Sequence, residues 1–147
     1  MTAIAEITTA AIAATSSMTL FSYAVADSAH RQYREPALLE SLLKPLMKGA
    51  PRMAKIVAAW AVHYCIGLAF TALFYMFHQK GLYDINWASG LVFGCTIGLT
   101  GMAGWKLFFS LRPDIRPSGT AGYFIQLFIA HLLFAATTVT VHVLFLP

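Results

Sequence analysis

The apolar positions of the chain gather into three long, nearly uninterrupted stretches. They cover residues 56–77, 88–111 and 123–146, and their polar members are a few histidines, one glutamine, hydroxyl side chains and Lys106. An α-helix rises about 1.5 Å per residue, so roughly 20 residues cross the ~30 Å hydrocarbon core of a bilayer. Each stretch therefore predicts a transmembrane helix.

A fourth span is expected at residues 7–26. This segment carries no charge and is built largely from Ala, Ser and Thr. A signal peptide would begin with basic residues, whereas Glu6 precedes this segment and the first basic residue is Arg31. We therefore expect a retained helix whose small side chains allow close packing. The alternative is a partly buried N-terminal arm.

The composition agrees with a membrane protein. Of 147 residues, 59% are hydrophobic and 11% are charged, against roughly 25% charged in a soluble domain. We predict one all-α domain over residues 1–147, an integral membrane bundle of four transmembrane helices. The expected partner is membrane lipid, and the positions of the basic residues argue against nucleic acid.

The basic residues are divided unevenly among the loops. One lies between the second and third spans, Lys80, and the other nine border the remaining two loops: Arg31, Arg34, Lys44, Lys48, Arg52, Lys55, Lys106, Arg112 and Arg116. Loops rich in Lys and Arg stay in the cytoplasm. Both basic loops are therefore predicted to be cytoplasmic and both termini extracytoplasmic. Trp105 and Tyr123 fall at the cytoplasmic edge, a depth that aromatic residues favour.

Residues 34–48, after the first span, predict an amphipathic helix. Its apolar positions recur at helical spacing and are Leu38, Leu39, Leu42, Leu43, Leu46 and Met47. Pro36 suits a first turn, while Pro45 should kink or end the helix. One interpretation is an interfacial helix with Lys44 and Lys48 at the membrane surface. The other is that its apolar face packs on the protein's own helix ends.

A polar turn at residues 112–119 separates the last two spans. Pro113 stops the preceding helix, and Asp114 lies between Arg112 and Arg116. A local ion pair is the simpler interpretation. The alternative is that the two arginines hold a phosphate or a lipid headgroup at the membrane surface.

The third span carries glycines at every fourth position, Gly90, Gly94 and Gly98. Residues four apart share one helix face, and missing side chains let another backbone approach closely. This GxxxG ridge predicts a helix-packing surface, directed either at another span of the same chain or at a second copy.

Two histidines, His63 and His131, are predicted near mid-membrane on spans that run in the same direction, with Gln126 close by. Three hypotheses follow: a structural hydrogen bond between helices, axial ligation of haem b, or a proton-handling site.

No catalytic motif is found: the sequence lacks a phosphate-binding glycine loop, a GxSxG motif and an HExxH motif. Cys65 and Cys95 lie inside spans without metal-ligand spacing, so no metal is expected.

Several short sequence segments resemble those of a group of small uncharacterised bacterial inner-membrane proteins. They are MTLFSY at 18–23, REP at 34–36, HYCIG at 63–67, GWK at 104–106 and QLFIAH at 126–131. The resemblance implies four helices in the bacterial cytoplasmic (inner) membrane and no established activity. Where that group usually carries Gly in the fourth span, this chain has Ala135.

The leading functional hypothesis is a non-enzymatic structural or accessory membrane protein. It would hold no cofactor and would pack with itself, as a homo-oligomer, or with a larger membrane complex. The alternative is a haem-binding or proton-handling protein that uses His63 and His131.

Overall fold

The computed structural model describes residues 3–145, and this part of the chain is all-helical. The helices are α1 (Ala3–Ala29), α2 (Glu35–Leu43), α3 (Arg52–Gln79), α4 (Trp87–Leu111), the single 3-10 turn η1 (Pro113–Ile115) and α5 (Thr120–Phe145). Four of them, α1, α3, α4 and α5, are long and apolar enough to cross a membrane. The predicted all-helical class and the four long apolar helices are thus confirmed. Residues 1–2 and 146–147 of the predicted domain, including the last residue of the predicted fourth span, lie outside the described residues.

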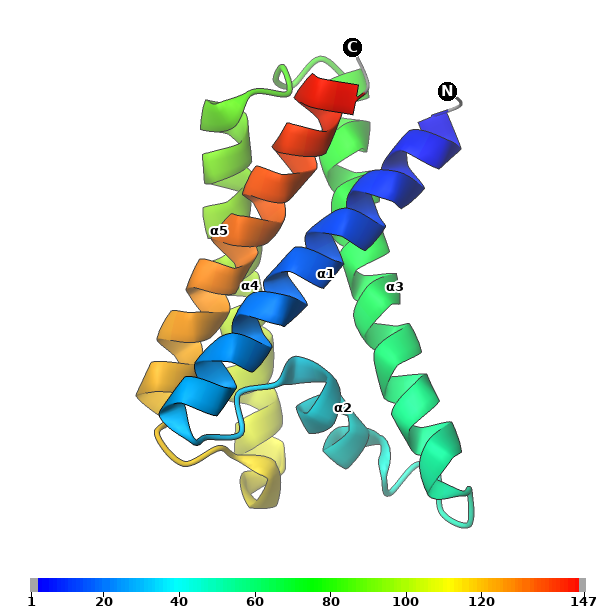
Figure 1. Cartoon of the computed structure of the whole chain (residues 1–147), viewed down its shortest axis with the longest axis vertical. Helices are drawn as coiled ribbons and strands as arrows, with labels where there is room; N and C mark the ends of the chain where they lie inside the picture. Colours follow the sequence, from blue (N-terminus) through cyan, green and yellow to red (C-terminus); the bar gives the residue numbers. More distant parts are fainter. Residues whose placement is uncertain (1–2, 146–147) are drawn as a thin grey trace.

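The long helices are arranged around α1, which crosses obliquely between α3 and α5 (Figure 1). α4 packs mainly on α5, whereas α3 packs mainly on α1 and on the short helix α2. α1 begins at the end of the bundle where α5 finishes, and α2 lies at the opposite end together with the α4–α5 connection (Figure 1). α1 therefore contacts both halves of the bundle, and Phe74 of α3 also packs on Phe93 of α4.

The glycine ridge of α4 faces α5 within the same chain. A Cβ atom placed on Gly90 would lie 2.5 Å from Val139 Cγ2, and one on Gly98 would lie 2.8 Å from Phe128 Cδ2. At Gly94 the added atom would meet Ala135 Cβ at 3.0 Å and the Leu132 backbone at 3.2 Å. Since real Cβ contacts are longer, these glycines set the separation between α4 and α5.

The short helix α2 packs inward with its apolar face. It begins at Glu35 with Pro36 in its first turn, and it ends at Leu43, so it is shorter than the predicted segment 34–48. Pro45 explains the early end, since proline clashes with the preceding helical turn. Leu38 and Leu39 are buried in a cluster with Trp105 and other residues of the long helices. Leu46, which was assigned to the same face, is 80% exposed in the turns that follow.

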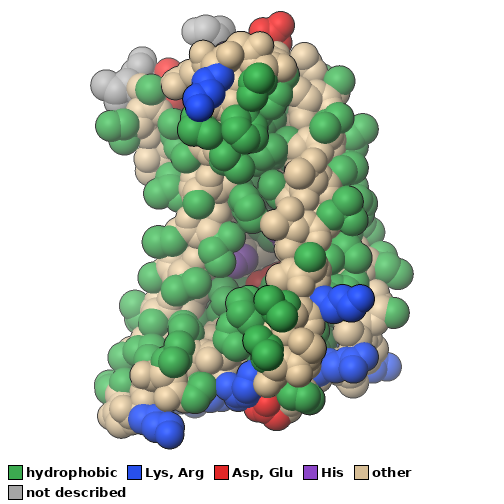
Figure 2. Space-filling model, turned by 180° about the vertical axis from the view of Figure 1, so that it is seen from behind, with side chains coloured by type: hydrophobic (Ala, Val, Ile, Leu, Met, Phe, Trp, Pro, Cys, Tyr) green, Lys and Arg blue, Asp and Glu red, His purple; other side chains and the backbone are tan. Residues whose placement is uncertain are grey.

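The long helices expose apolar side chains and keep small and hydroxylic ones inside. Leu20, Leu91 and Val92 are exposed, whereas Ala10, Ala14, Thr71 and Thr138 are fully buried. Figure 2 shows hydrophobic side chains over the whole length of the face in view, with most Lys and Arg side chains at one end. Such a distribution is the reverse of that on a soluble bundle. Trp105 and Tyr123, predicted at the membrane edge, are both buried, Tyr123 completely.

Candidate functional site

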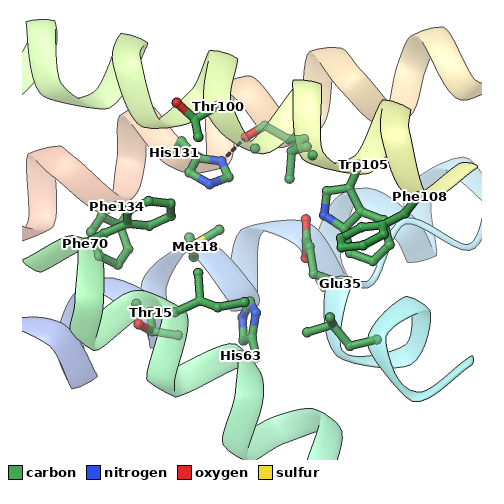
Figure 3. Close-up of a pocket in the computed structure, with 16 residues that line it drawn as sticks. Thr15, Met18, Glu35, His63, Phe70, Thr100, Trp105, Phe108, His131 and Phe134 are labelled. Atoms are coloured by element: carbon green, nitrogen blue, oxygen red, sulfur yellow. Dashed lines mark hydrogen bonds between the residues drawn. The ribbon is translucent and has the colours of Figure 1, made fainter. Parts of the chain in front are cut away.

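A cavity of about 170 Å³ lies inside the bundle, and all five α-helices contribute to its wall. Its polar members are Glu35 from α2, His63 from α3, His131 from α5, and the hydroxyls of Thr15 and Thr100. Aromatic side chains and glycines make up much of the remaining wall (Figure 3). The cavity is not closed on every side. Figure 2 shows a hollow in the surface with a histidine and an acidic side chain visible inside it.

Glu35 is a buried carboxylic acid, with 3% of the residue exposed. Ser22 Oγ of α1 and Gln126 Nε2 of α5 each donate a hydrogen bond to Glu35 Oε1, both at 3.1 Å. Gln126 Nε2 also donates to Ser22 Oγ at 2.6 Å, so the three side chains form one network. Glu35 Oε2 has no hydrogen-bond partner among the described residues.

No cation compensates the Glu35 carboxyl group in the described residues. The neighbouring Arg34 instead pairs with Asp27 and lies over the ring of Tyr23, at 5.0 Å from its centroid. Burial raises the pKa of Glu35 from 4.5 to about 7, although hydrogen bonds from its own backbone, Gln126 and Ser22 act in the opposite direction. This group therefore changes its charge near neutral pH.

His63 presents an unprotonated ring nitrogen to the cavity when its ring is neutral. Its Nε2 lies 2.9 Å from Thr19 Oγ1, and the Thr19 hydroxyl donates its only proton to the Thr15 carbonyl at 2.6 Å. The His63 Nε2–H must therefore be the donor to Thr19. Because a neutral imidazole has one N–H, Nδ1 of His63 is left as a hydrogen-bond acceptor.

His131 has the opposite tautomer, and its ring likewise leaves one nitrogen as a hydrogen-bond acceptor. Its Nδ1 lies 2.8 Å from the Leu127 carbonyl oxygen, which can only accept, so Nδ1 carries the proton and Nε2 is the acceptor. Gly101 of α4 makes room for the ring, since a Cβ atom there would lie 3.1 Å from His131 Nε2. The ring also contacts Phe70 edge to face, at 6.2 Å between centroids.

The structure brings the two predicted histidines to one cavity but does not hydrogen-bond them to each other. His63 bonds Thr19 and so links α3 to α1, whereas His131 bonds a carbonyl of its own helix. The expected contact between helices through a histidine hydrogen bond is therefore present between α3 and α1. It does not join His63 to His131 in the described residues.

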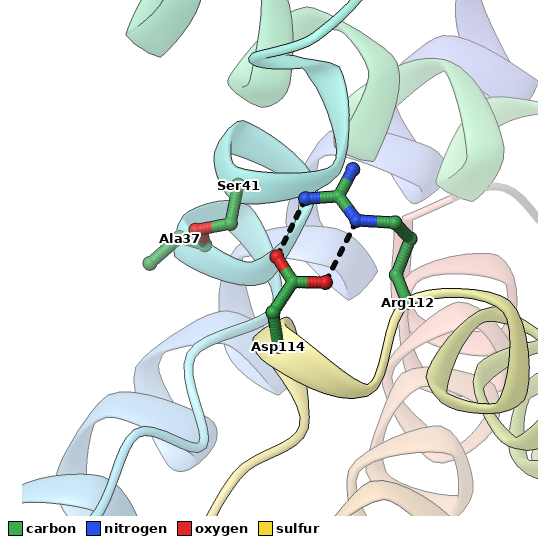
Figure 4. A network of polar contacts seen from close by, with 4 residues as sticks. All are labelled: Ala37, Ser41, Arg112 and Asp114. Atoms are coloured by element: carbon green, nitrogen blue, oxygen red, sulfur yellow. Dashed lines mark hydrogen bonds and ion pairs between the residues drawn. The ribbon is translucent and has the colours of Figure 1, made fainter.

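The residues predicted at the membrane surface lie away from the cavity. Lys44 and Lys48 are exposed. Arg112 donates two hydrogen bonds to Asp114, at 2.8 and 2.7 Å, and this pair lies beside Ala37 and Ser41 of α2 (Figure 4). These hydrogen bonds lower the pKa of Asp114. Arg116 donates to Thr120 Oγ1 at 2.9 Å. The local ion pair expected at this turn is thus formed by Arg112.

Glu35 is not among the site residues predicted from the sequence. One signal was available, because position 35 continues the apolar stripe of Leu38, Leu39 and Leu42 at helical spacing. An acidic residue on that stripe must be buried with the leucines when α2 packs inward.

The chain matches no protein-family model, no curated protein and no solved structure. The interpretation of the cavity therefore depends on its own geometry.

Proposed function

We propose that this chain is a multi-pass membrane protein that takes up and releases protons at Glu35, His63 and His131. The observation that carries the proposal is their convergence: three ionisable side chains from three different helices line one cavity. Ionisable groups inside a membrane bundle are costly to bury and usually mark functional sites.

Membrane insertion is part of this proposal. It is supported by the four long apolar helices and by the exposed leucines and valines on their outer faces. With the basic loops on the cytoplasmic side of a bacterial inner membrane, both termini are extracytoplasmic. α2 then lies at the cytoplasmic edge, with its leucines turned into the bundle and Lys44 and Lys48 at the lipid headgroups.

A purely structural accessory role would leave Glu35 unexplained. Packing between the long helices is supplied by small residues such as Gly94 and Ala135. A buried carboxyl oxygen without a partner costs on the order of 1–3 kcal/mol, and an apolar residue at position 35 would avoid this cost. Retaining Glu35 is thus better explained by a role for its proton.

The geometry favours a protonation site over haem ligation. The cavity of about 170 Å³ is smaller than the ~300–1,000 Å³ of typical cofactor pockets. In addition, His63 Nε2 is already engaged by Thr19. Haem ligation would require His63 to turn or to coordinate through Nδ1.

Titratable groups surround Glu35 from the neighbouring elements. Tyr23 of α1 and Tyr123 of α5 interact electrostatically with it. Arg34 precedes it in sequence, and His63 of α3 and His131 of α5 line the same cavity, whereas on α4 the cavity wall has no titratable side chain. None forms an ion pair with Glu35 in the described residues. Two ring nitrogens that can accept a hydrogen bond, His63 Nδ1 and His131 Nε2, belong to residues that line the same cavity.

Infrared difference spectroscopy on the protein in lipid nanodiscs tests this function. A protonated carboxylic acid gives a C=O stretching band that is lost on ionisation, so the wild type should show such a band titrating near neutral pH. Glu35→Gln should abolish this band. Glu40→Gln, on the same short helix, is the matched control and should leave it unchanged. A wild-type spectrum without a protonated carboxyl band above pH 6 would overturn the proposal.

A further inference from the structure

The cavity adjoins a second, apolar space between α3 and α4. This groove of about 620 Å³ shares Phe70 and Thr100 with the cavity. Its wall includes Leu73 and Phe77 of α3 and Val92 and Ile97 of α4, and it contains no charged side chain. Because α3 packs mainly on α1 and α2, and α4 mainly on α5, the groove lies between the two halves of the bundle. The cavity with its ionisable side chains, called the polar chamber below, therefore lies next to an apolar groove.

The polar chamber is suited to a neutral group that donates hydrogen bonds. With neutral rings, His63 Nδ1 and His131 Nε2 both accept, as established from their partners Thr19 and Leu127. No Lys or Arg lines the chamber, while Glu35 does. An anionic head such as a phosphate or a fatty-acid carboxylate would therefore lack a countercharge and would be repelled by ionised Glu35. A hydroxyl group meets acceptors instead.

The shape of the chamber is suited to one flat ring. Phe70 and Phe134 lie on one side and Trp105 and Phe108 on the other, with His63, His131 and Glu35 between them (Figure 3). Aromatic side chains in such positions contact the faces and edges of a ring. The volume of about 170 Å³ is close to the ~150 Å³ that accommodates benzene in an apolar protein cavity.

We propose that the cavity and groove together bind a membrane-soluble hydroquinone, with the hydroxylated ring in the chamber and the apolar chain along the groove. The inference deepens the proposed function and rests on it, because the same three side chains receive the ring. The ring hydroxyls donate to His63 Nδ1 and His131 Nε2, and the other polar residues of the chamber wall are Glu35, Thr15, Thr100 and Trp105. The oxidised quinone has only carbonyl acceptors and cannot donate to these histidines.

Equilibrium binding in detergent micelles under argon tests the ligand class with three probes of equal chain length. They are a decyl hydroquinone, the corresponding decyl quinone and decanoate. Two donated hydrogen bonds distinguish the first probe, so the hydroquinone should bind about tenfold tighter than either other probe. Equal affinity for the quinone, or tighter binding of decanoate, would overturn the proposal. This comparison needs no variant and does not depend on how any substitution folds.

A pair of substitutions on α4 tests the location. Gly104 lines the cavity, and a Cβ atom there would meet no other atom within 4 Å, so Gly104→Leu should fill the chamber without disturbing the fold. Ala103→Leu places the same side chain at an exposed neighbouring position. Hydroquinone affinity should fall about tenfold in the first variant and stay unchanged in the second. Equal losses in both variants would place the ligand elsewhere and overturn the proposal.

The experiments distinguish a failure of the proposed proton site from a failure of the proposed hydroquinone site. If the carboxyl band of Glu35 titrates near neutral pH but the hydroquinone is not preferred, the protonation site stands and the ligand class is wrong. If the hydroquinone binds as described while Glu35→Gln leaves the carboxyl band unchanged, the ligand site stands without the proton site. Binding that requires Gly104, together with a band that requires Glu35, supports both.

Discussion

Gln126 on α5 donates a hydrogen bond to Glu35 on α2, and the 3.1 Å contact joins two helices that are distant in sequence. The same amide nitrogen also reaches Ser22 on α1. One side chain thereby ties the short helix to two of the long ones, and it does so at the carboxyl group that we assign as the proton site.

Replacing Gln126 with Leu should therefore weaken the bundle and raise the pKa of Glu35 further, because the amide donor lowers that pKa. The loss of a buried donor to a carboxyl group should cost roughly 1–3 kcal/mol in the free energy of unfolding. Denaturant titration in micelles measures the first effect and infrared titration the second. Gln79→Leu, at an exposed end of α3, is the control. An unchanged carboxyl titration in Gln126→Leu would refute the assigned network.

The stability of the protein should fall as the pH rises through the range from about 4.5 to about 7. The folded state keeps the proton of Glu35 up to about pH 7, whereas the unfolded chain releases it near the ordinary value of 4.5. Between these values the folded state binds more protons, so its free energy of unfolding decreases with increasing pH. The full effect is about 3 kcal/mol, since one pKa unit corresponds to ~1.4 kcal/mol.

Unfolding in micelles at pH 5 and pH 8 measures this dependence. The decrease between the two pH values should be much smaller in Glu35→Gln, which has no proton to lose, than in the wild type and Glu40→Gln. A wild-type protein that is more stable at pH 8 than at pH 5 would show that Glu35 is ionised in the folded state.

The glycine ridge predicts a sharp contrast between two substitutions on α4. Gly94→Leu would place a large side chain against Ala135 and Leu132 of α5, so it should separate the helices and cost on the order of 1–3 kcal/mol. Leu91→Ala alters a residue that is 60% exposed and should have little effect. Stability and oligomeric state in detergent measure both. If Gly94→Leu kept the stability and oligomeric state of the wild type, the packing of Gly94 against α5 would be refuted.

Double-mutant cycles should show whether the two histidines interact with each other or with different partners. His63→Phe and Thr19→Val remove the same hydrogen bond, so their effects should be non-additive, with a coupling of roughly 0.5–2 kcal/mol. His63→Phe and His131→Phe remove bonds to different partners, and their costs should add within about 0.5 kcal/mol. Strong coupling in the second pair and none in the first would mean that the histidines bond each other in the membrane.

The proposed orientation is tested by reporters fused at two positions. A reporter after Pro147 should be extracytoplasmic, and one inserted near Gly49 should be cytoplasmic, because nine of the ten basic residues border the two loops at that end. Placement of both reporters on one side would contradict the three spans proposed between them, α3, α4 and α5.

The long helices were predictable because each depends on a local property, the length of an apolar run. Helix α2 was predictable in its start and in its end, since Pro36 and Pro45 act on their own neighbours. The cavity was not, because it depends on which faces of five helices turn towards one another. Glu35 illustrates the difference: its spacing from Leu38 and Leu39 places it on the apolar face of α2, but only the inward packing of that face shows that it is buried. Tyr123 is buried for the same reason, although its sequence position suggested the membrane edge.

The groove between α3 and α4 also determines how binding must be measured. With the helices inserted as we propose, an apolar-tailed molecule would reach the groove from the lipid phase, so the concentration that matters would be its mole fraction among the lipids. Diluting the aqueous phase will leave occupancy nearly unchanged, whereas adding empty vesicles will lower it. An affinity expressed per litre of buffer would then vary with the amount of lipid in the sample, even when the protein and its ligand remain the same.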